Sequence, residues 1–322
     1  MKNTKAPQLE TSQTIREIPL ACANEIAAVE FLEAQRWNGC PCCVHCGSQN
    51  VYKMVDDKTG ERNKRFLWRC RDCKEQYTVR IGTVYEESRI PLRHWCYAFW
   101  RASTSKKGVS ALEIKRHCQI SYKSALFLMH RIRYALTPDR KPRKKLECIV
   151  EADETYVGGK PRPGTGPHKA GRGTSKTPVF AMVERGGNIQ RRVVANVSGR
   201  TLKAALRECV DKEAKVITDD FASYSGVGKM FRGRHDVVCH SRGEYVLRGN
   251  PHINTNTVES SFAILKRGIT GIFHAVSKRH LHRYVGEFDF RWNTRRLNDG
   301  DRTIAAIRSA EGKRLMYRYV EP

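Results

Sequence analysis

Apolar and polar residues alternate differently in successive parts of the chain, and each pattern predicts a different kind of element. From residue 147 onward, short β-type runs alternate with segments of helical periodicity, which predicts an α/β domain with a mixed sheet. In the first run, alternation places Val150 and Ala152 on one face of the strand and Glu151 and Asp153 on the other. The strand-like runs are residues 147–156, 178–184, 189–197 and 215–218.

A helical pattern dominates residues 89–136. Gly108 separates the first helical stretch from a second, for which Ser110 and Glu113 form a capping box. Ser121 is placed to cap a third helix with a basic, polar outer face, so the last two helices are predicted to form a helix-turn-helix. An ordinary three-helix linker bundle is the alternative. The side chains expected to contact DNA on the third helix are Lys123, Ser124 and Arg131.

Cysteines cluster between residues 40 and 82, around two strand-like runs at 51–55 and 64–69. Cys43-x-x-Cys46 and Cys70-x-x-Cys73 are two pairs whose thiolates could close around one structural Zn²⁺, as in a zinc ribbon. Cys40 and Cys42 crowd the first pair, and Cys40 with Cys43 makes an alternative pair. Gly47 favours Cys43 and Cys46, because it supplies the permissive backbone that such a turn needs.

The charge balance is strongly basic, with 59 Lys and Arg against 33 Asp and Glu and a net charge of +26. Such an excess opposes compaction, so it indicates a nucleic-acid partner. Ribosome association or a simple solubility bias are the plainer alternatives. No run approaches the roughly 18–20 apolar residues of a membrane span, and the N-terminus lacks a signal-peptide pattern, so we expect a cytoplasmic, nucleoid-associated protein without a membrane partner. In that reducing compartment, the 12 cysteines are expected to be metal ligands or buried thiols.

Three acidic residues stand where elements begin or end, as a metal site requires. Asp153 lies in the first strand-like run, Asp219 ends the run at 215–219, and Glu259 begins a helix. Together they could hold two Mg²⁺ (or Mn²⁺) ions, which prefer oxygen ligands. Lys266 lies two turns after Glu259 on the same side of that helix and could neutralise a phosphate. Acids at strand ends are common in α/β proteins, and an acidic cluster within so basic a chain is what favours the metal site.

Two basic segments border or interrupt the α/β part. Residues 140–145 are a basic run broken by Pro142, which indicates a domain boundary. The glycine-rich stretch 158–173 has four Lys and Arg and no acid, and it is predicted to contact phosphates through Lys160 and Arg162. A plain solvated insertion is the alternative.

Twelve short sequence segments, given at the end of this paragraph, occur in order over residues 35–298. Together they resemble the bacterial DDE insertion-sequence transposases of the ISXO-like type. The resemblance implies a zinc ribbon joined to an RNase H-like catalytic domain, with Asp153, Asp219 and Glu259 as the metal-binding triad and Lys266 as its associated lysine. The extra Cys40 and Cys42 depart from the family pattern. The matching segments are Cys43-x-x-Cys46-Gly47, Arg69-Cys-Arg-Asp-Cys73, Gly82-Thr-Val, Ile90-Pro-Leu, Lys107-Gly-Val-Ser-Ala111, Ser121-Tyr-Lys-Ser-Ala125, Glu151-Ala-Asp-Glu-Thr-Tyr-Val-Gly-Gly-Lys160, Thr218-Asp-Asp-Phe-Ala-Ser-Tyr224, His252-Ile-Asn-Thr, Val258-Glu259, Leu265-Lys266-Arg267-Gly268 and His280-Leu-His-Arg-Tyr284.

The predicted organisation is therefore a tail and short helix at 1–39, a zinc ribbon at 40–82, a helix-turn-helix at 89–136, the RNase H-like domain at 147–298 and a C-terminal segment at 299–322. The predicted function is a transposase that binds the terminal inverted repeats of its element as a homo-oligomer, cuts double-stranded DNA and joins the ends to target DNA. One alternative is a DNA-binding regulator whose α/β domain is not catalytic. Another is a nuclease without strand transfer, which would share the acidic site.

Overall fold

A computed structural model describes residues 13–138, 144–159, 174, 176–239, 242–244, 246, 247 and 249–316 of the chain. The chain divides into two compact units. Unit 1 comprises Met1–Ser105, Ala111–Leu136 and Arg296–Pro322, and unit 2 comprises Lys106–Ser110 and Thr137–Arg295. Within the described residues, no helix has the length and apolar character needed to cross a membrane.

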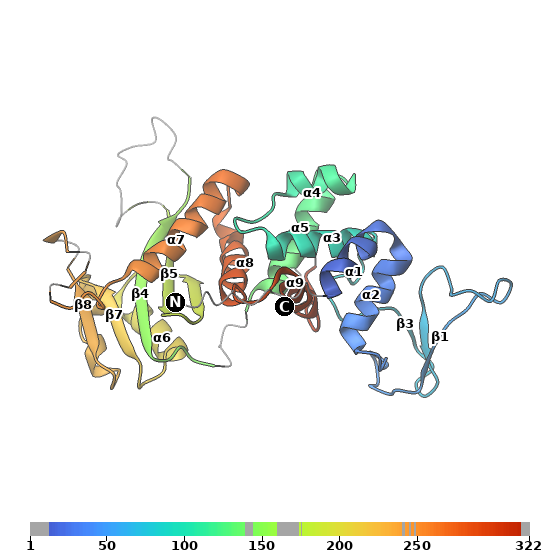
Figure 1. Ribbon diagram of the computed structural model, residues 1–322, viewed down its shortest axis with the longest axis horizontal. Helices are drawn as coiled ribbons and strands as arrows, with labels where there is room; N and C mark the ends of the chain where they lie inside the picture. The colour runs from blue at the N-terminus through green and yellow to red at the C-terminus, as the bar shows by residue number, and fades with distance from the viewer. Residues whose placement is uncertain are drawn as a thin grey trace, which may run out of the picture. The chain divides into compact units, whose positions relative to one another are not determined.

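Unit 2 is built on a five-stranded mixed sheet with the order β6-β5-β4-β7-β8 (Figure 1). β4, β5 and β6 pair antiparallel, whereas β7 runs parallel to β4 and β8 runs parallel to β7. The predicted mixed α/β fold is confirmed, and three antiparallel strands followed by two parallel ones is the RNase H-like arrangement. The strands span Ile149–Val157 (β4), Thr177–Glu184 (β5), Ile189–Val193 (β6), Lys215–Asp219 (β7) and His235–Val238 (β8).

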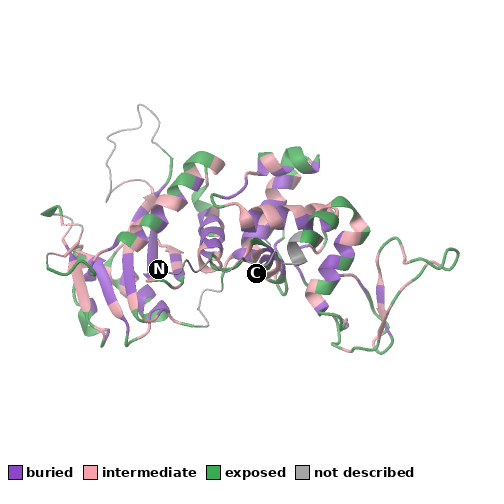
Figure 2. Cartoon of the chain, viewed as in Figure 1, coloured by how far each residue is buried: buried purple, intermediate pink, exposed green. Residues whose placement is uncertain are grey.

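Helices cover both faces of this sheet. Val150 and Ala152 of β4 pack in one core with α6 (Gly199–Cys209), as the alternation predicted. The opposite face packs against α7 (Asn256–Gly268) and α8 (Leu281–Asn293) through two further apolar clusters. Figure 2 shows the strands largely buried between these layers. A short π-helical segment, Ile269–Phe273, follows α7, and a 3-10 turn, Lys278–His280, precedes α8.

Close packing at Gly268 fixes the C-terminal end of α7. A Cβ atom there would lie 2.3 Å from Phe288 Cζ and 2.8 Å from the carbonyl oxygen of Lys107. Gly268→Ala is therefore expected to lower the free energy of unfolding of unit 2 by about 1–3 kcal/mol, the usual cost of overpacking. Gly271→Ala is the matched control, since a Cβ at Gly271 meets nothing within 4 Å. Equal free energies of unfolding for the two variants, measured by calorimetry, would contradict this account of the packing.

Unit 1 contains the small antiparallel sheet β1-β2-β3, made of Val51–Lys53, Trp68–Cys70 and Gln76–Tyr77. The sheet packs on α2 (Glu25–Trp37), where Trp37 and Trp68 meet edge to face with ring centroids 5.3 Å apart. The Trp68 indole N–H donates to buried Glu33 at 2.7 Å. A further helix, α1 (Gln13–Ala23), precedes α2 and was not predicted, because Pro19 lies inside it.

The remaining helices of unit 1 are α3 (Leu92–Thr104), α4 (Ala111–Cys118), α5 (Tyr122–Leu136) and α9 (Asp299–Arg308). Ser121 caps α5 as predicted, since its Oγ accepts the Ser124 N–H at 3.1 Å. Three residues separate α4 from α5, which is a short connection of the kind predicted. The assignment of these two helices as a DNA-binding helix-turn-helix stays a prediction. The C-terminal segment belongs to unit 1, because α9 packs on α3 and the buried hydroxyls of Ser103 and Thr303 lie 3.0 Å apart.

Candidate active site and zinc centre

The three predicted acids of unit 2 come from three elements that meet on one side of the sheet. β4 and β7 are parallel, with Glu151 beside Ile217. Two residues further along each strand stand Asp153 and Asp219, which therefore lie at the same level on the same face. Glu259 is in the first turn of α7, which packs against β4 on that face. The fold thus brings together residues 66 and 40 positions apart in the sequence.

The acids act on one another electrostatically. Burial, together with the negative charges of Glu154, Asp219 and Glu259, raises the pKa of Asp153 to about 8, although the Glu154 N–H donates to its Oδ1 at 2.7 Å. Asp219, rather than its exposed neighbour Asp220, is the β7 acid that contributes to this shift. Burial is the largest cause of the raised pKa, and the neighbouring carboxylates add to it with negative charge that a bound cation would balance.

The spacing of the acids differs from that of a compact single-ion site. Among the described residues, only the four ribbon cysteines form a group of three or more potential ligands with all ligand atoms within 4.8 Å of one another. The carboxylate oxygens of Asp153, Asp219 and Glu259 are therefore spread more widely. A pair of ions about 3.5–4 Å apart spans such a spread, because each ion takes a different subset of the oxygens.

Other side chains orient the site. The Thr255 hydroxyl donates to Glu259 Oε1 at 2.8 Å, and the buried Tyr224 hydroxyl donates to Glu154 Oε2 at 2.8 Å. Lys266 is exposed on α7 two turns after Glu259. A cavity of about 280 Å³ opens beside Asp219 and is lined by residues 219–222, 224–226, 235 and 237.

The four predicted zinc ligands of unit 1 converge. Cys43 and Cys73 sulfur atoms lie 3.6 Å apart, and those of Cys46 and Cys70 lie 3.7 Å apart. Gly47 has a φ of +76°, which is the permissive backbone expected after the first pair. The backbone N–H of Cys73 lowers the pKa of the Cys70 thiol to about 7, which favours the thiolate that binds metal. Cys40 and Cys42 are outside the cluster, so the structure supports structural zinc at Cys43, Cys46, Cys70 and Cys73.

The second cysteine pair is tied to the first through Asp72. Its carboxylate accepts hydrogen bonds from the Ser48 hydroxyl and, at 2.9 Å, from the Asn50 side-chain amide. These bonds lower the pKa of Asp72, with the Ser48 bond as the larger cause. Both turns of the ribbon are therefore held in place beside the sulfur atoms.

Two known protein families match the parts of the chain that carry these residues. Residues 145–293 match the ISXO2-like transposase domain, and residues 23–76 match the transposase zinc-ribbon domain. The chain therefore contains an ISXO2-like transposase domain and a transposase zinc-ribbon domain. The second match begins before the first ribbon ligand, Cys43, and takes in α2, consistent with the packing of α2 on the ribbon through Trp37 and Glu33.

The transposase is also similar to a protein described as uncharacterized in transposable element ISH50 of Halobacterium salinarum, with 29% identity over 283 residues, 83% of this chain and 90% of the relative. A crystal structure of the Mos1 strand transfer complex aligns with 62% of this chain and 69% of its own, at 12% identity and a TM-score of 0.27. A simian T-cell lymphotropic virus intasome in complex with PP2A regulatory subunit B56 gamma aligns with 56% of this chain and 62% of its own, at 11% identity and a TM-score of 0.26. TM-scores this low do not establish a shared fold.

One predicted DNA contact of the transposase is wrong. Arg131 is buried, and its guanidinium donates to the carbonyl oxygens of Leu315 at 3.0 Å, Val84 at 2.9 Å and Glu86 at 2.7 Å. These acceptors cover the face of α5 that looked exposed when the helix was considered alone. Arg131 therefore joins α5 to two distant segments of unit 1.

The other predicted DNA contacts are placed differently. Lys123 is exposed at the second position of α5, and Ser124 is half-buried with its Oγ 2.9 Å from Ser121 Oγ. Their contact with DNA stays a prediction. Lys160 and Arg162 lie outside the described residues.

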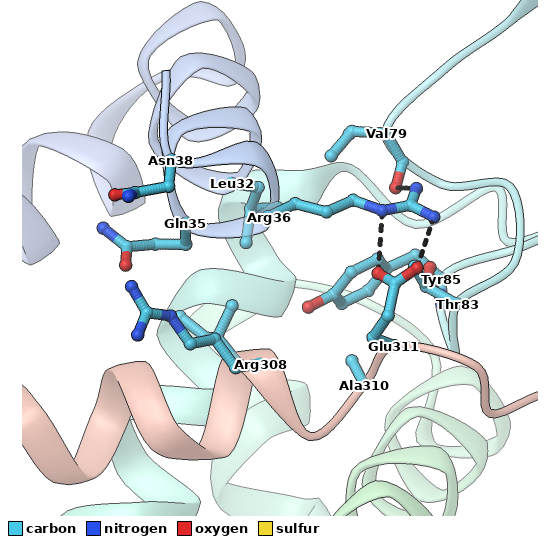
Figure 3. Close-up of a pocket in the computed structure, with 11 residues that line it drawn as sticks. Leu32, Gln35, Arg36, Asn38, Val79, Thr83, Tyr85, Arg308, Ala310 and Glu311 are labelled. Carbon is cyan, nitrogen blue, oxygen red and sulfur yellow. Dashed lines mark hydrogen bonds and ion pairs between the residues drawn. The ribbon is translucent and has the colours of Figure 1, made fainter. Parts of the chain in front are cut away.

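A second cavity, of about 360 Å³, lies within unit 1 between α2, α9 and residues 79–85 (Figure 3). The Arg36 guanidinium makes two 2.7 Å contacts with the Glu311 carboxylate and donates to the carbonyl oxygen of Val79 at 2.9 Å. Figure 3 shows this pair on one side of the cavity and Arg308 on another. None of the three acids lines this cavity. The Arg36–Glu311 ion pair at its edge connects α2 to the segment that follows α9.

Proposed function

We propose that this transposase cuts the ends of its element and joins the freed 3′-hydroxyls to target DNA with Asp153, Asp219 and Glu259 as ligands of divalent cations. The observation that carries the proposal is the meeting of three half-buried carboxylates from β4, β7 and α7 at one negatively charged place in a chain of net charge +26. The basic surface suits a polyanionic substrate, and the acidic centre suits the cation that the chemistry needs.

The donor set fits magnesium or manganese. All three side chains offer hard carboxylate oxygens, which these ions prefer to sulfur or nitrogen. The raised pKa of Asp153 fits as well, because the charges that raise it are those a divalent cation would balance. The bound ions would supply Lewis acidity that activates the attacking oxygen and stabilises the leaving oxygen.

The protein side chains would hold the metal ligands in place and orient the DNA phosphate. Asp153 is held by the pairing of β4 with β5 and Asp219 by the pairing of β7 with β8, and Thr255 holds Glu259 through a 2.8 Å hydrogen bond. Lys266, exposed on the same helix as Glu259, would neutralise a phosphate of the bound DNA strand. Displacement at phosphorus needs the attacking and leaving oxygens in line, so positioning and charge neutralisation are the main tasks of these residues.

The remaining parts of the proposal concern recognition. Zinc would hold the ribbon folded beside α2, and unit 1 would bind the terminal inverted repeats with Lys123 and Ser124 near the bases. Lys160 and Arg162, which belong to the sequence of unit 2, would contact phosphates. Two ends must be held together for joining, which calls for a homo-oligomer. In the cell, the protein would act on DNA in the cytoplasm, at the nucleoid.

A cleavage and joining assay tests the proposal. Purified protein is incubated with labelled duplexes that carry the terminal repeats and with a target plasmid, in Mg²⁺, in Mn²⁺ or in EDTA. We expect cleavage and joining with either ion and neither reaction in EDTA, and we expect Glu259→Gln to remove both while end binding persists. Specific end binding without cleavage in any ion would favour the regulator instead, and cleavage without joining would favour a nuclease.

A further inference from the structure

Glu151 is a fully buried carboxylate that the proposed chemistry does not use. It lies on β4 two residues before Asp153, on the same face. Its Oε1 accepts from Arg185 Nε at 2.6 Å and from the Thr257 hydroxyl at 2.9 Å, and its Oε2 accepts from the Val258 N–H at 2.9 Å. Both oxygens are thus occupied by donors from the protein, and Glu151 is not arranged as a metal ligand.

Two of these contacts, from Thr257 and Val258, fall on the first turn of α7. Thr255 is the residue before the helix, and its side chain makes no capping hydrogen bond there. The Val258 N–H is one of the amides that the start of a helix leaves without an intrahelical acceptor. The Glu151 carboxylate accepts that hydrogen bond from the neighbouring strand, and its charge suits the positive end of the helix dipole.

Arg185 extends the same network to the segment that leads into α7. Its guanidinium donates to the carbonyl oxygens of His252 and Asn254, the latter at 2.8 Å, and to Asn254 Oδ1 at 3.2 Å. Because Arg185 directly follows β5, one ion pair links two strands of the sheet to residues 252–258. The residue after Val258 is Glu259.

We infer that Glu151 and Arg185 are positioning residues that set the separation between Asp153 and Glu259. Glu151 shares a strand with the first acid and holds the helix turn that carries the third. Loss of this anchor leaves all three proposed ligands in the chain but frees the Glu259 turn to move away from β4. The inference rests on the proposed function, since Glu151 is assigned the role of maintaining the geometry of that metal site.

Glu151→Gln is the direct test, because it keeps the size of the side chain but turns one acceptor into a donor that faces N–H groups. Cleavage of the labelled element ends is measured against Mg²⁺ concentration for the full-length protein. We expect the Mg²⁺ concentration for half-maximal cleavage to rise by about 10- to 100-fold, the range seen when residues that orient metal ligands are removed. Saturating Mg²⁺ should restore much of the rate, and binding of the ends should be unchanged.

Two further variants make the test specific. Thr257→Val removes a single hydroxyl donor to Glu151 and should shift the Mg²⁺ dependence in the same direction by a smaller factor. Glu208→Gln breaks the Arg192–Glu208 ion pair, where Glu208 lies on α6, and should leave the Mg²⁺ dependence as in the wild type. If Glu151→Gln does not fold, Thr257→Val carries the comparison, and a wild-type Mg²⁺ dependence in that variant would overturn the inference.

Hydrogen exchange in the absence of DNA separates this inference from the proposed function. The Val258 amide should exchange at least about tenfold faster in Glu151→Gln, whereas the Leu265 amide, further along α7, should stay protected. Equal exchange of Val258 in the wild type and the variant would overturn the anchor. A wild-type protein that cleaves in no metal would instead refute the proposed function, and the exchange measurement would still report on the anchor.

Discussion

Asp153→Asn is expected to abolish cleavage and joining, with a fall in rate of at least about a thousandfold, because it removes a charged ligand from the point where transition-state charge must be balanced. Asparagine has the same shape and keeps an oxygen that can accept the Glu154 N–H, which donates to Asp153 at 2.7 Å in the wild type. The variant should therefore fold and bind DNA ends as the wild type does. Steady-state cleavage and joining rates at saturating Mg²⁺ provide the measurement.

The same substitution has an expected effect on stability. The folded protein raises the Asp153 pKa from its ordinary 3.8 to about 8, so the metal-free folded state retains a proton that the unfolded chain has lost. Between these values, the free energy of unfolding should fall as pH rises, because the folded state binds more protons than the unfolded state. Asp153→Asn should reduce this dependence on pH in EDTA and should remove most of the stabilisation that Mg²⁺ gives.

Glu213→Gln is the matched control for Asp153→Asn. Glu213 belongs to the same unit, and it forms an exposed ion pair with Arg232 at 2.9 Å. Loss of one surface carboxylate should leave both reaction rates unchanged. Joining at the wild-type rate by Asp153→Asn would rule out Asp153 as a metal ligand.

Removal of zinc should have the second large effect. The four sulfur atoms hold together a three-stranded sheet whose strands have only two or three residues each, and binding of structural zinc typically contributes about 10–16 kcal/mol to folding of such a domain. Cys70→Ser should reduce bound zinc from one ion per chain to a small fraction and should unfold the ribbon. The Trp37–Trp68 contact gives a fluorescence signal for that loss.

Cys40→Ser and Cys42→Ser are the matched controls for the zinc prediction. Cys40 is exposed and Cys42 is half-buried, and neither belongs to the cluster of four sulfur atoms. Both variants should keep one zinc ion per chain and the wild-type fluorescence. Loss of zinc from either one, or full zinc in Cys70→Ser, would show that the ligand set is different.

The sequence was most informative where a short spacing carries the structure. The two cysteine pairs identified the four clustered thiols, and Gly47 distinguished Cys43 and Cys46 from the crowded alternatives, because the turn needs a positive φ. Alternation along β4 placed Val150 and Ala152 on one face, which packs against α6 in the structure, and Asp153 on the other face. In each case, the informative signal is a pattern within a few residues of the chain.

Several features that depend on distant segments were not predicted. Arg131 has the pattern of an exposed basic residue on a helix, yet its acceptors come from Val84, Glu86 and Leu315, which no local pattern brings together. The same reason hid the packing of α9 on α3. Strand β8 has four residues and lacks a strong alternation, so its signal was weak. For Glu151, the available signal was a charged residue within an otherwise buried strand.

The most direct test of the central claim is to locate Mn²⁺ by its anomalous scattering in crystals of the wild-type protein. Two anomalous peaks about 3.5–4 Å apart, contacted by oxygen atoms of Asp153, Asp219 and Glu259, are the predicted result. Peaks confined to other carboxylates, or three acids with their oxygen atoms directed to separate surfaces while Mn²⁺ binds elsewhere, would contradict it.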